Sequence, residues 1–379
     1  MLTFGVFYFF YFGILGIYLP YFNLYCKDLG FTSAQIGFVS AIHPFARLAF
    51  PVLWAIGADH FGKRHFFVRW AWFLSMMTFL VLFFANSFTS VLWVLIIYAF
   101  FMVPVLPLWE ATTLEWVHKS KSNYGAIRLW GSLGFIAFSL CFGQLLDQYS
   151  NRLVLYGVGV LSFFNFLLLV RIKDEAEIEK QRLSDLIRFL AQIDLWIFLG
   201  CLTLMVFSHG TFYGFFSIYM RELGYSKTLI GMLWTTGVIC EIGLMLLTGK
   251  MKNVHWLLYV LPLCFLAAML RWWINAKFVL VWMLFLSQAL HGLTFGSFHV
   301  ASVRLIHRIF PPFMRSSGQS LYSSFSFGLG GVLGLIINGW YYDSLGPRKL
   351  FEINCWVAFF GLLLTCLLIY RNRTSCLIR

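Results

Sequence analysis

The sequence is poor in charged residues. Asp, Glu, Lys and Arg together make up 11% of its 379 residues, whereas 60% of the residues are hydrophobic. A water-soluble domain needs a largely polar surface, and too little polar sequence remains here to form one. The composition therefore excludes a soluble catalytic module and predicts an all-α protein that crosses a lipid bilayer many times.

Several signals of enzyme chemistry are also absent. The eight cysteines show no paired spacing, which argues against a disulfide framework or a metal site. There is no cluster of metal ligands, no nucleophile motif and no nucleotide-binding loop. We therefore expect neither an enzyme nor a bound cofactor. The first apolar stretch has no basic residue before it and no small-residue cleavage site, so we interpret it as a retained span.

Long apolar runs occupy most of the chain. A membrane-spanning helix needs about 20 mostly apolar residues. Twelve stretches qualify, and the turns between them are short. Their approximate ranges are 3–24, 33–57, 66–86, 89–112, 125–146, 153–171, 195–219, 228–249, 255–274, 278–300, 318–341 and 351–370.

The net charge of +13 indicates membrane topology rather than a nucleic-acid partner. With Met1 inside, 18 of the 28 Lys and Arg residues fall in or beside cytoplasmic segments, and 7 fall in outer turns. This asymmetry favours two cytoplasmic termini by the positive-inside rule. In a bacterium the membrane would be the inner membrane. The remaining three basic residues lie within spans: Arg47, Arg128 and Arg271.

The chain divides into two similar halves. The polar segment 173–194 separates six predicted spans (residues 1–172) from six more (195–379). Residues 27–37 recur as residues 221–231, with four identical and four conservatively replaced positions at an offset of 194. Such a parallel repeat of two six-helix bundles is typical of major facilitator transporters.

Two charges inside predicted spans are the most informative feature. If the spans on either side of residue 119 form an antiparallel pair, Glu110 and Arg128 both lie about nine residues, or roughly 13 Å, from the turn. They would then face each other at one depth. Charges inside a membrane are unfavourable and usually mark a solute or ion path. We predict that this pair binds solute, with Trp109 and Trp130 as cavity walls; a purely structural ion pair is the alternative.

A second group of charged and titratable residues lies in the other half. Glu241 occupies mid-span, at the position that corresponds to Arg47 in the repeat. It has no basic residue within two turns of its own helix, so it either pairs across helices or carries a proton. The relative depth of Arg271 and His291 in the membrane depends on the turn between their spans. They lie at almost the same depth if the turn centres near residue 280, and differ in depth by about two helical turns if it centres near residue 277.

The turn between the second and third spans carries Asp59, Gly62, Lys63 and Arg64, which resemble a loop pattern of the major facilitators. We interpret these residues as a gating motif. Other strings resemble the phenylpropionate permease-like branch of that superfamily, which is related to lactose permease and the nucleoside–proton symporters. These strings are residues 9–12, 18–22, 124–132, 270–272 and 290–295.

The resemblance implies roles for matching residues. Lactose permease has an acid eighteen residues before its sugar-binding arginine, and here these positions are Glu110 and Arg128. Its arginine and histidine of spans nine and ten, twenty residues apart, correspond to Arg271 and His291. Its sugar-stacking tryptophan is Phe135 here, and its proton-carrying glutamate is Thr294. The resemblance thus leaves the solute and the proton carrier open.

The sequence as a whole predicts a monomeric secondary transporter that imports a small organic solute with protons. Aromatic acids, nucleosides and saccharides all remain possible solutes. We expect Glu241, Arg271, His291 and Arg47 to take part in proton coupling, with Glu110 as the rival carrier. The alternatives are an efflux antiporter, a facilitated exchanger or, more remotely, a membrane enzyme or sensor. Import is favoured because residues 128–146 lack the Gly-Pro motif of drug-efflux antiporters.

The predicted topology can be tested with a reporter that is active only in the cytoplasm. Fused after Arg379 it should be active, and fused into the turn at residues 87–89 it should be inactive, because an even number of spans places both termini inside. An active turn fusion or an inactive C-terminal fusion would contradict the topology.

Overall fold

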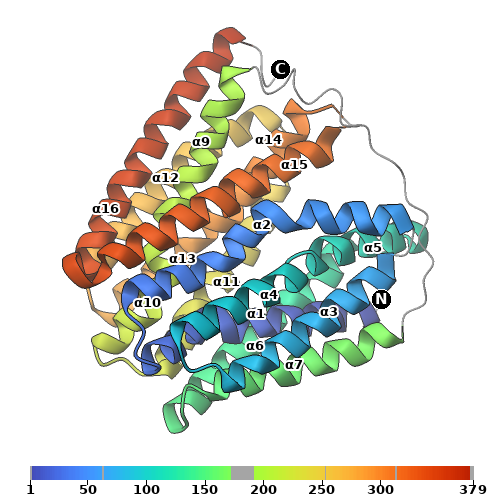
Figure 1. The fold of residues 1–379 in the computed structure, drawn as a ribbon. Coiled ribbons are helices and arrows are strands. Elements are labelled where there is room, and N and C mark those ends of the chain that lie inside the picture. The colour runs from blue at the N-terminus through green and yellow to red at the C-terminus, as the bar shows by residue number, and fades with distance from the viewer. Residues whose placement is uncertain (1, 62–63, 172–191, 252, 312–313, 376–379) are drawn as a thin grey trace. The chain divides into compact units, whose positions relative to one another are not determined.

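The structure is a computed structural model that describes residues 2–61, 64–171, 192–251, 253–311 and 314–375 (Figure 1). Every regular element in these residues is a helix. The elements are α1 (Leu2–Asp28), α2 (Ser33–Phe61), α3 (Arg64–Leu80), η1 (Val81–Phe84), α4 (Phe88–Met102), α5 (Val105–Ser120), α6 (Tyr124–Gln148), α7 (Leu153–Val170), α9 (Ile193–Ser208), α10 (Gly210–Glu222), α11 (Lys227–Gly249), α12 (Val254–Lys277), α13 (Val281–Ala289), η2 (Gly292–Ser297), α14 (Phe298–Ile309), α15 (Arg315–Ser323), η4 (Ser324–Gly330) and α16 (Gly331–Ser375).

Nine helical stretches among the described residues are long and apolar enough to cross a membrane. The predicted all-α membrane class is therefore confirmed. The predicted span 33–57 also falls in a helix, α2, and the span 278–300 falls largely in α13, η2 and α14. The last two predicted spans lie on either side of Gly346, where α16 turns with a φ of 76°. The count of twelve stays a prediction.

Several of these helices are interrupted. The helical run between residues 193 and 222 breaks at His209, between α9 and α10. Two segments, Gly292–Ser297 and Ser324–Gly330, are π-helical. A π segment inserts an extra residue into the turn and changes the direction of the neighbouring side chains, and such segments often occur at functional sites.

The chain divides into two compact units. Unit 1 comprises Met1–Lys180 with Ser217–Thr235, and unit 2 comprises Gln181–Phe216 with Thr236–Arg379. The predicted boundaries of the two bundles, 1–172 and 195–379, stay a prediction. Most of the predicted linker 173–194 lies outside the described residues.

In unit 1, α1 packs along both α6 and α7 (Figure 1). Glycines allow this close approach. A Cβ atom built on Gly134 of α6 would collide with the carbonyl oxygen of Phe9, and one built on Gly16 of α1 would lie 2.5 Å from that of Phe135. The helix backbones therefore touch directly, which fixes the depth of α6 against α1.

The N-terminus of α11 belongs to unit 1 because Asp147, near the end of α6, caps it. The Asp147 carboxylate accepts hydrogen bonds from the backbone N–H groups of Lys227 and Thr228, at 2.7 and 2.9 Å, and from the Thr228 hydroxyl at 2.6 Å. A carboxylate stabilises a helix N-terminus both as an acceptor and through the helix dipole.

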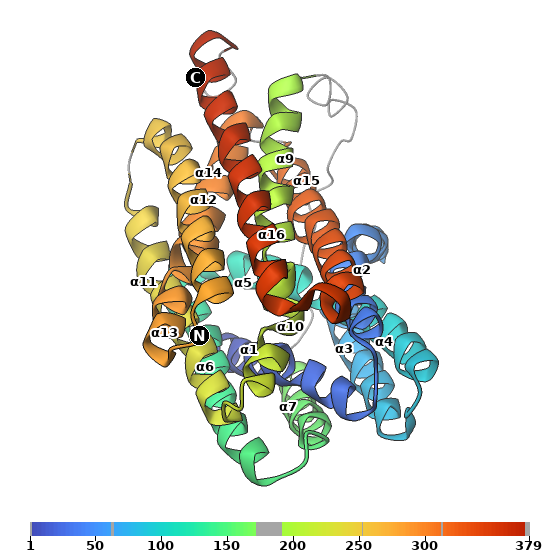
Figure 2. The same ribbon diagram turned by 90° about the vertical axis from the view of Figure 1, so that its left-hand side faces the viewer.

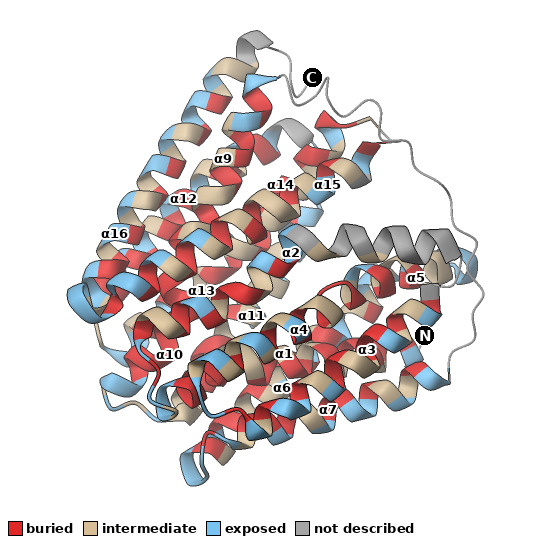
Figure 3. Ribbon diagram, in the orientation of Figure 1, coloured by how far each residue is buried: buried red, intermediate tan, exposed pale blue. Residues whose placement is uncertain are grey.

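In unit 2, α9 and α12 both pack against α16 (Figure 2). Gly210 closely approaches the backbone of Gly334 at the break between α9 and α10. Beside it, the buried side chains of Thr211, Asn338 and Asn354 hydrogen-bond to one another. These contacts bind the broken helix firmly to α16. Exposed residues remain spread along the outer turns of the helices in each unit (Figure 3).

The sequence repeat corresponds to a repeated turn. Gly30 and Gly224 both adopt left-handed φ values, 81° and 84°, which favour glycine. Their N–H groups donate to the backbone carbonyl oxygens of Lys27 and Arg221, at 2.9 and 3.0 Å. The helices α1 and α10, which precede these glycines, therefore end with the same backbone motif.

The predicted gating motif falls largely outside the description. Gly62 and Lys63 are not among the described residues, and the side chains of Asp59 and Arg64 are not described. Their gating role stays a prediction.

The close approach of α1 and α6 yields a test by substitution. Gly134→Ala should lower the yield and Tm of the purified protein, because overpacking typically destabilises by about 1–3 kcal/mol. Gly159→Ala is the matched control, since its Cβ would make an ordinary 3.5 Å contact with Leu80. Size-exclusion chromatography after heating measures both variants. Equal Tm values for the two would contradict the packing argument.

Candidate functional site

The first candidate site is the charge pair in unit 1. Glu110 lies on α5 and Arg128 on α6, and the turn between these helices is tightly built. Lys121 ends α5 in the left-handed conformation, and the Asn123 side chain accepts from the N–H of Ala126 to cap α6. This short turn makes the two helices neighbours, so residues equally far from it meet.

The structure brings the Glu110 and Arg128 side chains together. Arg128 Nε donates to Glu110 Oε1 at 3.3 Å, and the Tyr124 hydroxyl donates to the same oxygen at 3.4 Å. The guanidinium lies 4.0 Å from the ring centroid of Phe12 and 5.2 Å from that of Tyr8. Both charged side chains are about one-third exposed. The pair is thus partnered yet accessible, as a solute-binding group would need to be.

Three aromatic residues predicted to line the solute site lie in different environments: the cavity walls Trp109 and Trp130, and Phe135 at the position of the sugar-stacking tryptophan. Trp109 is fully buried and packs on Phe7, with ring centroids 4.3 Å apart. Its indole N–H has no hydrogen-bond acceptor among the described residues. Trp130 is 37% exposed and lies against Gly5 of α1. Phe135 is almost fully buried on α6. Trp130 is therefore the most accessible of the three.

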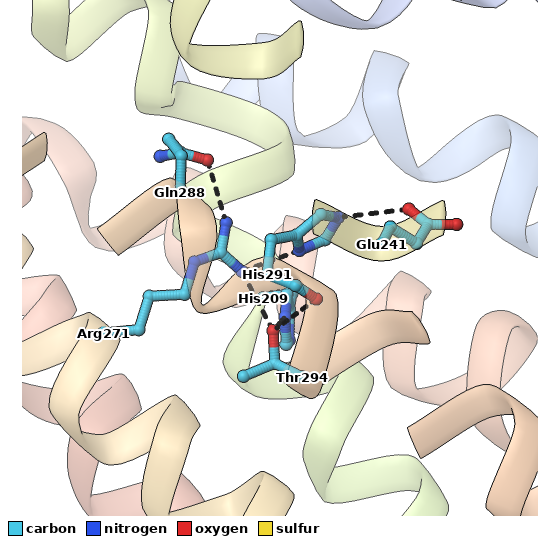
Figure 4. Close-up of polar contacts among 6 residues, drawn as sticks. All are labelled: His209, Glu241, Arg271, Gln288, His291 and Thr294. Carbon is cyan, nitrogen blue, oxygen red and sulfur yellow. Dashed lines mark hydrogen bonds and ion pairs between the residues drawn. The ribbon is translucent and has the colours of Figure 1, made fainter. Parts of the chain in front are cut away.

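The second candidate site lies wholly in unit 2 and centres on Arg271 of α12. The side chain of Arg271 is fully buried. Its guanidinium lies over the rings of Phe212 and Trp272, at 4.2 and 4.6 Å. It donates hydrogen bonds to His291 Nδ1 at 2.9 Å, Thr294 Oγ1 at 3.2 Å and Gln288 Oε1 at 3.2 Å (Figure 4).

The contact between Arg271 and His291 shows that the two side chains reach the same depth. The turn between α12 and α13 lies at residues 278–280, so its centre is closer to residue 280, the position that makes the two residues nearly level in depth, than to residue 277. His291 directly precedes the π-helical segment, and its ring lies between Arg271 and Glu241 (Figure 4). Glu241 of α11 places a carboxylate oxygen 3.9 Å from His291 Nε2.

These contacts define the tautomer of His291. A guanidinium is only a donor, so the Nδ1 atom facing Arg271 must accept. The ring proton of neutral His291 therefore resides on Nε2, which faces Glu241. Protonation of Nδ1 would break its hydrogen bond to Arg271 and place two cations side by side. His291 is consequently a neutral link between Arg271 and Glu241 in this state.

A second chain of hydrogen bonds holds Arg271 from the other side. His209 Nδ1 faces the carbonyl oxygen of Met205 at 2.8 Å, so this nitrogen must carry the proton. His209 Nε2 therefore accepts from the Thr294 hydroxyl, 3.2 Å away. The hydroxyl oxygen in turn accepts from Arg271. The helix break at His209 is thus connected to the buried cation.

Sequence reasoning missed part of this cluster. It assigns no functional role to His209 or Gln288, and it treats Thr294 only as a departure from lactose permease. The position of His209 before Gly210 was an available signal of a helix break. No sequence signal indicated that Gln288 contacts Arg271, because that contact depends on how α12 packs against α13. Arg47, predicted to act with this group, is an exposed residue of α2 in unit 1.

The fold matches known transporters. The structure superposes on that of a mutant of the nucleoside transporter NupG with a TM-score of 0.87, covering 97% of this chain and 99% of that one at 17% identity. Together with its apolar helices, this likeness shows that the chain has the fold of that integral, multi-pass membrane protein.

Comparison of sequences gives the family. The profile of the MFS_1 like family matches residues 1–353, and the chain belongs to that family. It is similar to the probable 3-phenylpropionic acid transporter of Escherichia coli (strain K12), with 29% identity over 89% of this chain and 90% of that protein. It is also similar to the maltose permease of Geobacillus stearothermophilus, with 24% identity over 98% and 95% of the two chains.

The role of the unit 1 pair can be tested by comparing Glu110→Ala, Arg128→Ala, the double alanine variant and the charge swap. Removing one partner leaves an unpaired charge, so either single variant should express poorly. The cost should fall below the roughly 3–5 kcal/mol of a fully buried pair, because these side chains are partly exposed. The double variant should recover expression without recovering solute binding.

The measurements are the yield of monodisperse protein and solute affinity. A purely structural pair predicts that the double variant or the swap recovers transport as well as expression. Wild-type affinity in a well-expressed double alanine variant would refute a binding role.

Proposed function

We propose that this protein imports a small organic solute together with protons by alternating access. The observation that carries the proposal is the position of Glu241. It is an acid within an apolar helix, its carboxylate lies 3.9 Å from His291, and His291 accepts from the buried Arg271. An intramembrane acid connected to other polar groups is the usual form of a proton relay.

In this proposal Glu241 carries the proton. A carboxyl group can exchange a proton while its neighbours keep their hydrogen bonds, whereas protonation of His291 would break its bond to Arg271. Because Nε2 of His291 faces Glu241, ionisation of Glu241 strengthens that contact and protonation weakens it. The protonation state of Glu241 is thereby transmitted to Arg271.

Glu110 and Arg128 would bind the polar part of the solute. Their partial exposure and the neighbouring aromatic rings of Tyr8 and Phe12 support this role. The names of the relatives indicate three solute classes to examine: 3-phenylpropionate, maltose and nucleosides. We propose that the protein acts as a monomer in a bacterial inner membrane, with both termini in the cytoplasm.

Uptake into proteoliposomes tests the proposal, with 3-phenylpropionate, maltose and uridine as probes. An inward proton gradient should drive accumulation of one probe above its external concentration. Glu241→Gln should abolish this accumulation but retain counterflow exchange, because exchange of bound solute does not require release of the proton.

Glu222→Gln is the control, since it makes the same acid-to-amide change at an exposed position at the end of α10. It should accumulate solute normally. Accumulation by the Glu241→Gln variant would make Glu110 the candidate carrier. Accumulation driven only by an outward gradient would indicate an antiporter instead.

A further inference from the structure

The helix α11 belongs to both compact units. Its residues 227–235 lie in unit 1, and its residues 236–249 lie in unit 2. With the end of α10 and the turn between the two helices, the first part forms a hairpin tip, Ser217–Thr235. This tip packs with unit 1, although the chain on both sides of it belongs to unit 2. A single helix is therefore attached to two units.

The hairpin tip is a stiff piece of structure. Trp234 Nε1 donates to Ser217 Oγ at 3.2 Å, which joins its two helices. At the turn, the N–H group of Tyr225 donates to the carbonyl oxygen of Met220 at 3.0 Å. The helix α11 contains no proline and no π segment, which are two of the usual causes of a sharp kink. We therefore expect the tip and the rest of α11 to move as one body.

The attachment of the hairpin tip to unit 1 is polar. The exposed carboxylate of Asp147 accepts from the N–H groups at the start of α11, and Lys227 Nζ donates to the carbonyl oxygen of Leu146 at 2.6 Å. Further along the helix, the hydroxyl of the fully buried Ser139 donates to the carbonyl oxygen of Gly231 at 3.4 Å. Water can replace such contacts when they open, because it supplies the same donors and acceptors.

The attachment of α11 to unit 2 is close apolar packing. A Cβ atom built on Gly292 of η2 would lie 2.6 Å from the carbonyl oxygen of Cys240, and one built on Gly296 would lie 3.0 Å from that of Glu241. The side chains of Leu244 and Met245 also lie against these two glycines. Opening apolar packing exposes buried surface and loses contacts that water does not replace. The unit 2 attachment is thus the more unfavourable of the two to open.

The two attachments cannot both persist through a transport cycle. Alternating access moves the two halves of such a transporter about a central site. A straight helix that is held by both units cannot follow both of them. The attachment that opens is then the polar one, at the hairpin tip. Glu241 and the cluster around Arg271 stay together, because the other attachment keeps the second part of α11 on unit 2.

We propose that the hairpin tip is a releasable latch: it is docked on α6 in the present conformation and leaves α6 in another state of the transport cycle. Asp147 holds the docked tip. Gly143, one turn earlier on α6, gives it room, because a Cβ atom there would lie 2.8 Å from the carbonyl oxygen of Lys227. This inference rests on the alternating access of the proposed function, and it adds the contact that has to break.

A buried thiol reports release of the latch without any solute. Ser139→Cys places a thiol against α11, where the docked tip keeps it buried. In the purified full-length protein, a polar maleimide should alkylate this thiol over time, as measured by mass spectrometry. Asp147→Ala in the same protein should speed the alkylation, because it removes the acceptor that holds the tip.

Ser162→Cys is the matched control, since Ser162 is an equally small buried residue of unit 1 but lies on α7. Its thiol should stay unmodified. A Ser139→Cys thiol that is never alkylated, or that is alkylated no faster than the Ser162→Cys thiol, overturns the inference.

Cross-linking tests whether release is needed for transport. The side chains of Asp147 and Thr228 meet at 2.6 Å, so a short reducible thiol cross-linker should join the Asp147→Cys and Thr228→Cys pair in the purified protein. After reconstitution, the linked protein should lose counterflow exchange of 3-phenylpropionate, maltose or uridine, and reduction should restore it. The Ser87→Cys and Ser90→Cys pair is the control, because these hydroxyls lie 2.9 Å apart within one turn of α4. Linking them should leave exchange intact.

The outcomes separate the latch from the proposed function. If the linked protein exchanges solute as fast as the reduced one, the tip stays docked during transport and the inference fails, while import stands. If the unmodified protein exchanges solute but does not accumulate it on a proton gradient, proton coupling fails. Loss of exchange on linking would still support the latch in that case.

Discussion

The compensation of buried charge in a medium without water is the constraint on which this structure depends. Apolar helices tolerate few charges, and each charge present requires a partner or a function. In unit 1 the requirement is met directly, because Arg128 donates to Glu110. In unit 2 it is met indirectly, because His291 separates Arg271 from Glu241. The indirect arrangement leaves the cation responsive to protonation of the acid.

Irregular helix geometry positions the cluster of residues around Arg271 in unit 2. The break between α9 and α10 places His209 beside the Thr294 hydroxyl, and the π-helical segment that contains Thr294 begins directly after His291. A regular helix presents side chains at fixed angular steps. The break and the π segment change those steps locally, so that residues from three helical regions converge on Arg271. Close glycine contacts, such as Gly210 on Gly334, hold these regions in place.

Much of the fold was predictable because its signals are local. Apolar length predicts the helices, and the repeated turn at Gly30 and Gly224 follows from a backbone conformation that favours glycine. The meeting of Glu110 and Arg128 was predictable for a similar reason, since a short turn determines which residues of two adjacent helices face each other. Arg271 and His291 were less certain, because two positions of the turn between them were compatible with the sequence.

The sequence by itself determined the membrane class, the repeated halves and the charged residues that require partners. Composition and spacing along one chain are sufficient for these conclusions. Only the tertiary structure decided which partners those residues have. Gln288, Thr294 and His209 lie 17, 23 and 62 residues from Arg271 along the chain, and their contacts depend on helix packing, a π segment and a helix break. The helix packing and the π segment are not encoded in a spacing that the sequence alone reveals.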